Sequence, residues 1–257
     1  MEYLIICIVT LIGAGLTLFS GFGLGTLLMP VFGIFFPIDV AIGLTAIVHF
    51  SNNLIKLGFF YKHLDWSVIK RFGIPSVFAA ILGAYLLTTL SDLKPIFSYS
   101  IFDSDFSVTP IKLTIATLLI IFSLFELIPK LSDLQFDKKY ISLGGFLSGF
   151  FGGLSGNQGA LRSAFLIRAG LTKEVFIGTG VVIACFVDLA RLSIYSQSVL
   201  THIDNSKIIL LIVAVTSAFI GVYIGNRLLK KMTIKALQVI VSVLILIFSL
   251  LLGVGII

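Results

Sequence analysis

The stretch GLSGNQGALRSAF, residues 153–165, interrupts a strongly apolar part of the chain. It combines glycines, which permit sharp turns and close backbone approach, with Asn157, Gln158 and Arg162. A charged side chain at membrane depth is costly, so it normally faces the interior of a helix bundle or a wet cavity. We therefore expect a turn inside a membrane-spanning bundle, with polar side chains directed at a site.

The composition is typical of an integral membrane protein. Of 257 residues, 58% are hydrophobic and 12% are charged, and the mean hydropathy is +1.14. Soluble domains contain about 25% charged residues. The apolar runs are continuous, which favours helices over a β-barrel. The net charge of +6 is explained by basic loops, and no soluble basic surface remains for nucleic acid.

Another glycine-rich turn, SGFGLG at 20–25, occurs earlier in the chain than the turn at 153–159. In chain order these are the first and the second turn. A shift of 135 residues aligns Ser20 with Ser155, and it aligns Asn53 and Lys56 with Asp188 and Arg191. A shift of 138 aligns GAY at 83–85 with GVY at 221–223. Matches in the same order at nearly constant offset indicate an internal duplication.

We predict an all-α fold: a polytopic transmembrane helical bundle of two inverted-topology repeats. Each repeat is expected to be a broken or re-entrant helical hairpin followed by three transmembrane helices. The first, residues 1–130, is predicted to contain hairpin 3–36 and helices 39–61, 68–90 and 110–129. The second, residues 131–257, is predicted to contain hairpin 138–170 and helices 173–196, 206–229 and 234–257. Whether the hairpins cross the membrane or re-enter is left open.

The loop charges agree with this inversion. Segments 61–71, 129–139 and 226–235 hold three, three and four Lys or Arg residues, whereas 197–205 holds none. If the basic segments are cytoplasmic, the spans alternate consistently and both termini lie outside. The aromatic-rich linker 91–110, with a single lysine, is interpreted as lying at the outer interface.

Candidate substrate-binding residues come first from the two turns. A helix that begins after such a turn directs free N–H groups and a positive dipole end at the site, which favours an anion. For the glycines the alternative is helix packing alone. For Arg162 it is an interfacial position or a structural pair with Asp188. The turn residues assigned to substrate binding are Ser20, Gly21, Gly23, Gly25, Ser155, Gly156, Asn157, Gln158, Gly159 and Arg162.

Polar faces on the helices after each hairpin supply further candidates. His49, Asn52, Asn53 and Lys56 follow helical spacing on one face, and Asp188 lies three residues before Arg191, so these two can pair. The alternatives are a purely structural acid–base pair, a lysine that reaches the interface and a histidine that only joins helices. We assign substrate binding to Asn52, Asn53, Lys56 and Arg191, and proton or charge coupling to His49 and Asp188.

Enzyme chemistry is weakly supported. We expect neither a cofactor nor a metal, because the sequence has no His, Asp and Glu cluster at metal-ligand spacing. Ser155 matches the Gly-x-Ser-x-Gly nucleophile pattern only in part. An enzyme acting through Ser155 or Cys185 is the weaker alternative. Glu126, near a helix end at Pro129, is interpreted as interfacial.

Two motifs resemble those of the TauE/SafE family, the sulfite and organosulfonate exporter-like permeases. They are GFGLGTLLMPVFG at 21–33 and GGFLSGFFGGLSGNQGALRSAFLI at 144–167, and the resemblance covers nearly the whole chain. Gln158 and Arg162 stand where many members have small residues and a proline. The resemblance implies a multi-pass protein of the bacterial inner (plasma) membrane that transports sulfur-containing anions.

From the residues and the resemblance together we expect a secondary transporter, an exporter in direction, for a small anion such as sulfite or an organosulfonate. It would work by alternating access around the two turns. The alternative is an anion channel on the same scaffold. The expected partners are this anion, the lipid bilayer and a coupling proton or sodium ion, with no nucleic acid.

The inverted topology predicts that segments 61–71 and 197–205 lie on opposite sides of the membrane. We expect His63→Cys and Leu200→Cys, each in a background with Cys7 and Cys185 replaced by Ala, to react with an impermeant thiol reagent from opposite sides of oriented vesicles. Labelling after permeabilisation controls for reactivity. Labelling of both positions from one side would contradict the inversion.

Overall fold

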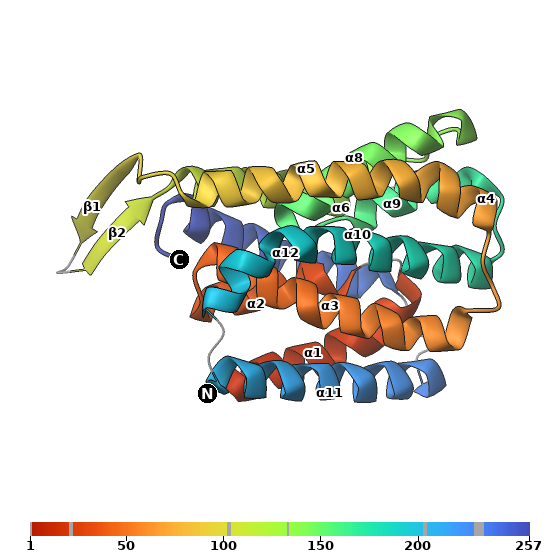
Figure 1. The fold of residues 1–257 in the computed structure, drawn as a ribbon, viewed down its shortest axis with the longest axis horizontal. Helices are drawn as coiled ribbons and strands as arrows, with labels where there is room; N and C mark the ends of the chain where they lie inside the picture. The colour runs from red at the N-terminus through yellow and green to blue at the C-terminus, as the bar shows by residue number, and fades with distance from the viewer. Residues whose placement is uncertain (1, 21–22, 102–103, 133, 203–204, 229–233) are drawn as a thin grey trace.

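The computed structural model describes residues 2–20, 23–101, 104–132, 134–202, 205–228 and 234–257. In these residues the helices lie alongside one another, and a small two-stranded sheet projects from one end (Figure 1). The elements before residue 128 are α1 (Glu2–Ser20), α2 (Leu24–Phe35), α3 (Ile38–Phe60), α4 (Trp66–Val68), the π-helical η1 (Ile69–Gly73), α5 (Ile74–Ser91), β1 (Phe97–Ile101), β2 (Ser104–Val108) and α6 (Pro110–Leu127).

The described part of the chain from Pro129 onward is also mainly helical. Its elements are α7 (Pro129–Ser132), η2 (Lys138–Tyr140), α8 (Ile141–Ser155), α9 (Gly159–Leu166), η3 (Ile167–Ala169), α10 (Lys173–His202), α11 (Asn205–Leu228) and α12 (Ile234–Gly253). Within the described residues, five helices are long and apolar enough to cross a membrane: Ile38–Phe60, Trp66–Ser91, Pro110–Leu127, Lys173–Ser196 and Lys207–Arg227. The predicted polytopic helical bundle is confirmed.

Both predicted hairpins contain a helix too short to span a bilayer. With 12 residues, α2 is about 18 Å long, whereas the hydrocarbon core of a bilayer is about 30 Å thick. In the second hairpin, α8 ends at Ser155, and the next residue, Gly156, has φ +79° and donates its N–H to the Gly152 carbonyl at 3.0 Å. This left-handed cap stops the helix, and α9 begins three residues later.

The first arm of each hairpin packs along a long helix from the other half of the chain. Along the α8–α5 contact, Gly145 meets Phe72, Gly149 meets Ser76 and Gly153 meets Ala80, so the two helices run parallel. In the same way α1 runs parallel to α11, where Gly221 meets Leu11 and Gly225 meets Gly15. The two contacts are therefore reciprocal: the first hairpin helix of each half packs along a long helix of the other half.

Two further helix pairs are antiparallel. The end of α3 lies at Gly178 near the start of α10, while His49, earlier in α3, reaches Asp188. Glu126, at the end of α6, bonds to Ser242 in the middle of α12, while Ala116, earlier in α6, lies at Gly253, the last residue of α12. If α3 corresponds to α10 and α6 to α12, an inverted repeat requires these opposite directions. We therefore retain the two-repeat organisation as a proposal that this packing supports.

The linker between α5 and α6 contains a β-hairpin that we did not predict. β1 pairs antiparallel with β2, from Phe97 opposite Val108 to Ile101 opposite Ser104. The Tyr99 hydroxyl donates to the Val254 carbonyl at 2.5 Å and so attaches this β-hairpin to the end of α12. The segment FSYSI and residues 105–108 of SDFSV alternate apolar and polar residues, which is a signal for strands.

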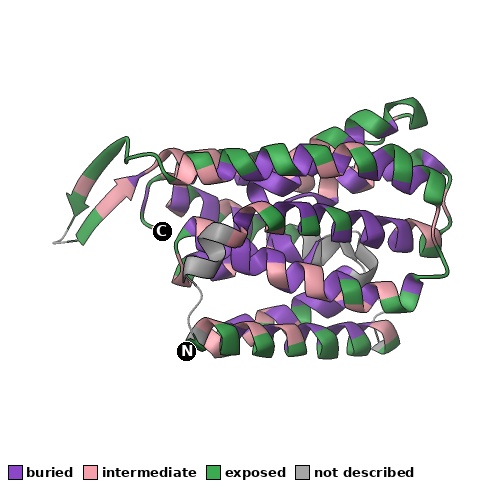
Figure 2. Ribbon diagram, in the orientation of Figure 1, coloured by how far each residue is buried: buried purple, intermediate pink, exposed green. Residues whose placement is uncertain are grey.

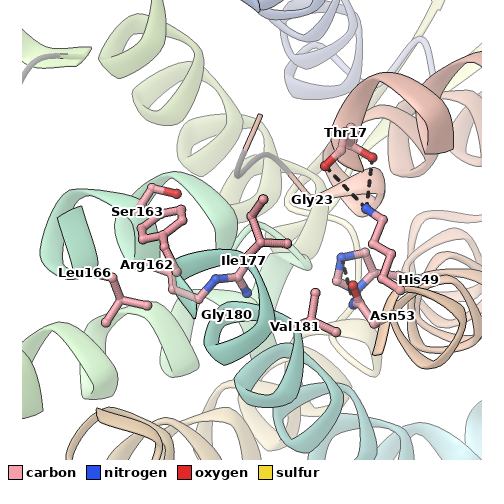
Figure 3. Close-up of a pocket in the computed structure, with 12 residues that line it drawn as sticks. Thr17, Gly23, His49, Asn53, Arg162, Ser163, Leu166, Ile177, Gly180 and Val181 are labelled. Carbon is pink, nitrogen blue, oxygen red and sulfur yellow. Dashed lines mark hydrogen bonds between the residues drawn. The ribbon is translucent and has the colours of Figure 1, made fainter. Parts of the chain in front are cut away.

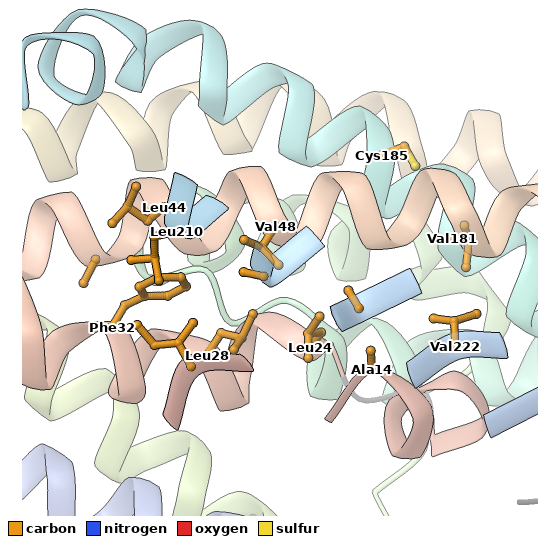
Figure 4. Packing of buried hydrophobic residues seen from close by; sticks show 14 of the residues in the cluster. Ala14, Leu24, Leu28, Phe32, Leu44, Val48, Val181, Cys185, Leu210 and Val222 are labelled. Carbon is orange, nitrogen blue, oxygen red and sulfur yellow. The ribbon is translucent and has the colours of Figure 1, made fainter. Parts of the chain in front are cut away.

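Burial separates the inner and outer faces of the helices (Figure 2). Large apolar side chains, among them Phe78, Tyr85 and Ile212, are more than half exposed on the outside, as expected where the solvent is lipid. Inside, side chains from α1, α2, α3, α10 and α11 form a shared apolar cluster (Figure 4). This cluster holds the first hairpin against the long helices.

The α5–α8 contact predicts that Gly149 tolerates no side chain. In Gly149→Ala the new Cβ would fall against the Ser76 carbonyl, so the helices would have to separate. Overpacking of this kind costs about 1–3 kcal/mol. We expect a lower thermal unfolding temperature for the purified protein in detergent.

Gly58→Ala is the matched control, because Gly58 is an exposed glycine of α3 with open space around its Cβ position. We expect it to unfold at or above the temperature of the parent, since Ala favours helix over Gly. Equal effects of the two substitutions would contradict the close contact.

Candidate functional site

The buried carboxylate of Asp188 joins three elements. Its Oδ1 accepts hydrogen bonds from Nε and Nη2 of Arg191, also on α10, at 3.0 and 2.8 Å. Its Oδ2 lies 2.7 Å from Nδ1 of His49 and accepts from Nδ2 of Asn53 at 3.3 Å, both on α3. Nε2 of Gln158, in the turn between α8 and α9, lies 3.5 Å from Oδ1. The second turn is thus tied to α3 and α10.

The Asp188–Arg191 pair agrees with the structural alternative considered from the sequence. Both side chains have 0% exposure, and a buried charge is tolerated only when it is paired and hydrogen-bonded. Nη1 of Arg191 also lies 3.4 Å from the Gly152 carbonyl, in the last turn of α8. The guanidinium is therefore occupied by protein groups.

Lys56 and Arg162 differ from Arg191, because neither has an acidic partner among the described residues. Nζ of Lys56 donates to the carbonyl and the hydroxyl of Thr17, both at 3.3 Å. Nη1 of Arg162 is buried and has no hydrogen-bond partner there. The structure therefore contains two buried cations whose charge no carboxylate balances directly.

Both cations line one cavity of about 30 Å³ (Figure 3). It lies between the end of α1, the middle of α3, α9 and the start of α10. None of the residues lining it is acidic, so its electrostatic character is positive and favours an anion. The lining residues are Thr17, Gly23, His49, Asn53, Lys56, Arg162, Ser163, Leu166, Phe176, Ile177, Gly180 and Val181.

The two glycine-rich turns meet beside His49. A Cβ on Gly25 would lie 3.5 Å from the Gly156 carbonyl oxygen and 3.5 Å from Cδ2 of His49. A Cβ on Gly23 would lie 3.1 Å from Nε2 of the same imidazole. Glycine at position 23 therefore lets the first turn approach α3 closely, whereas the distances at Gly25 are ordinary contacts.

The candidates from the sequence fall into separate places. Gly23, His49, Asn53, Lys56 and Arg162 lie together on the cavity lining. His49 and Asn53 also contact Asp188, as do Gln158 and Arg191, while Gly25 and Gly156 lie where the turns meet. Asn157 and Gly159 line a second cavity.

Of the remaining candidates, Asn52 and Ser155 line neither cavity. Asn52 is buried with no partner in the described residues for either polar atom of its amide. Ser155 is buried, and its hydroxyl donates to the Phe151 carbonyl at 3.0 Å. Ser20 ends α1, but its side chain and the whole of Gly21 lie outside the described residues. Cys185, the other candidate nucleophile, lies in the apolar cluster.

Several lining residues were missed from the sequence. Thr17 and Gly180 lie in apolar runs, and only their position near a candidate turn or polar face could have singled them out. Glu126 gave a clearer signal as a carboxylate in an apolar run. The structure places it on the second cavity with Asn157, where its Oε2 accepts from Ser242 at 2.7 Å.

Comparison with known proteins gives one family. A family model described as sulfite exporter TauE/SafE matches residues 5–252, which is almost the entire chain. No curated protein matches the chain significantly.

The buried ion pair between Asp188 and Arg191 predicts that Asp188→Asn is strongly destabilising. The substitution leaves the Arg191 guanidinium buried without a counterion, which costs about 3–5 kcal/mol. We expect a large drop in thermal unfolding temperature. The double variant Asp188→Asn/Arg191→Met should recover part of the loss, because it removes the uncompensated charge.

Asp137→Asn is the matched control. Asp137 is 58% exposed in its contact with Arg168, and exposed ion pairs contribute little to stability. If the two Asp→Asn substitutions had equal effects on unfolding, the structural role of Asp188 would be wrong.

Proposed function

The chain belongs to the sulfite exporter TauE/SafE family, and on that premise we propose that it is a secondary transporter that exports a small sulfur-containing anion, such as sulfite or an organosulfonate. It is a multi-pass membrane protein, and we place it in a bacterial inner membrane. The observation that carries the proposal is the pair Lys56 and Arg162, which line one cavity with no acidic residue in the lining.

The cavity offers donors suited to a sulfur oxyanion. Nη1 of Arg162 has no partner in the described residues, and Lys56 has three ammonium N–H donors, of which Thr17 accounts for two. Charge-assisted bonds from such groups to an oxyanion are about twice as strong as neutral ones. A volume of about 30 Å³ suits the smallest anions, so we favour sulfite over a bulkier sulfonate.

Access is proposed to alternate by movement of the hairpins against the long helices. The cavity reaches Leu166 and Phe176, near Arg168 and Lys173. By the charge rule these two cations lie at the cytoplasmic face, so we interpret the site as nearer to the inside in this conformation. The Asp188 cluster, which ties the second turn to α3 and α10, would guide the movement.

Arg162→Gln tests the anion site. We expect sulfite flux in proteoliposomes to fall roughly 10- to 100-fold, which corresponds to about 1.5–3 kcal/mol for a hydrogen bond to a charged group. Lys56→Gln should act in the same direction. The measurement is the uptake of labelled sulfite as a function of its concentration, with protein-free liposomes subtracted.

Arg168→Gln is the matched control, since Arg168 is 54% exposed and bonds to Gln135 and Asp137. It should transport like the parent, and parental flux in both Arg162→Gln and Arg162→Ala would overturn the site.

Flux without saturation or counterflow would favour a channel. Ser155→Ala and Cys185→Ala should keep transport, and sulfite consumption that either variant abolishes would favour an enzyme.

A further inference from the structure

A second cavity lies on another side of the same hairpin turn. It has a volume of about 10 Å³, enough for one water molecule. Asn157 and Gly159 line it, whereas Arg162, one helical turn further on, lines the first cavity. The other lining residues come from α2, α6, α9 and α12: Thr26, Phe122, Ser123, Glu126, Ala160 and Ile245.

Glu126 is the titratable residue of this lining. Its Oε2 accepts a 2.7 Å hydrogen bond from the hydroxyl of Ser242, which is fully buried on α12. No ion pair to it occurs in the described residues. An ionised carboxylate with so little compensation in a bilayer is costly, whereas a protonated one is not.

Asn157 contributes a polar group to this cavity that has no hydrogen-bond partner in the described residues. This side chain is 7% exposed, and neither its amide nitrogen nor its amide oxygen has a hydrogen-bond partner in the described residues. One water between Asn157 and Glu126, or a carboxyl O–H directed at the amide oxygen, would satisfy such a group. The amide is thus available to respond to the protonation state of the carboxyl.

Few other charged groups lie on the elements around Glu126. The sequences of α2 and α8 contain no titratable residue, and the titratable residue of α9, Arg162, lines the first cavity. On α5 the candidate is Tyr85, which is 67% exposed on the outer face. Lys130 lies on the short helix α7, and Lys235 belongs to the first turn of α12, where its side chain lies outside the described residues.

We propose that Glu126 is the residue that binds the coupling proton, with Asn157 relaying its protonation state to the second turn. The proposal rests on the transport function proposed above and moves the coupling role away from His49 and Asp188. The carboxylate takes up one proton from one side, is carried neutral through the conformational change and releases that proton on the other side. Arg162 and Asn157 belong to one turn and its helix, so the two cavities change together.

The test compares two modes of transport in proteoliposomes. Equilibrium exchange of labelled sulfite needs the anion site but no net proton movement, whereas accumulation driven by a pH gradient needs coupling. We expect Glu126→Gln to keep exchange and to lose gradient-driven accumulation. Gln has the shape of the protonated carboxyl and still accepts the Ser242 hydrogen bond, so the fold should be retained, as checked by thermal unfolding.

Glu174→Gln is the matched control, because Glu174 is exposed in the first turn of α10. It should keep both exchange and accumulation. The Glu126→Gln liposomes also correct for the effect of the gradient on the protonation of sulfite itself.

The outcomes separate the two proposals. A parent that does not exchange sulfite overturns the proposed function. A parent that exchanges sulfite without gradient-driven accumulation overturns the coupling proposal alone, as does accumulation that survives in Glu126→Gln. Loss of exchange in a folded Glu126→Gln assigns Glu126 to anion turnover instead. A variant that fails to fold also contradicts the proposal, since a coupling carboxyl must tolerate its neutral form.

Discussion

The carboxylate of Asp188 is the constraint on which the centre of this protein depends. A fully buried charge must be matched, and Asp188 is matched by Arg191 on its own helix and by His49 and Asn53 on α3. Gln158 adds the second hairpin turn to the same carboxylate. Because this one group uses donors from three elements, it fixes where the turn lies and leaves Arg162 to face the cavity.

Glycine provides the other constraint, since it sets how closely the hairpins approach the long helices. The reciprocal α1–α11 and α5–α8 contacts bring backbone against backbone at Gly221 and Gly149, where a Cβ would fall against the Leu11 and Ser76 carbonyls. Helices in lipid gain little from the hydrophobic effect between them, so such close packing supplies much of the association. Close packing at the glycines of their helices therefore holds the hairpins in place, and the residues of the turns can be polar.

Much of the fold was predictable from the sequence, because its signals are local. Apolar runs of spanning length predicted the long helices. SGFGLG and GLSGNQG lie where α1 is followed by α2 and α8 by α9, and the broken hairpins inferred from them stay a prediction. The i, i+3 spacing gave the Asp188–Arg191 pair. The β-hairpin was missed because we interpreted its linker by overall polarity, although FSYSI alternates with period two.

The site was less predictable, because it depends on contacts between distant segments. Helical spacing placed Asn52 with His49, Asn53 and Lys56, yet Asn52 is not on the cavity lining. Which buried cation is compensated, Arg191 or Arg162, depends on rotamers and neighbours that spacing does not encode. The same limit concealed the role of Thr17 as the partner of Lys56.

The two cavities give the second turn a physical reason to couple two solutes. One is lined by the cations Lys56 and Arg162, the other by the carboxyl of Glu126, and residues 157–162 contribute to both. Filling the first with an anion removes the cost of uncompensated positive charge, and protonating the second removes the cost of a poorly compensated negative one. Each event lowers the electrostatic cost of moving the same turn within lipid. In the proposed mechanism this turn, with cations on one side and a carboxyl on the other, couples the two events without direct contact between proton and anion.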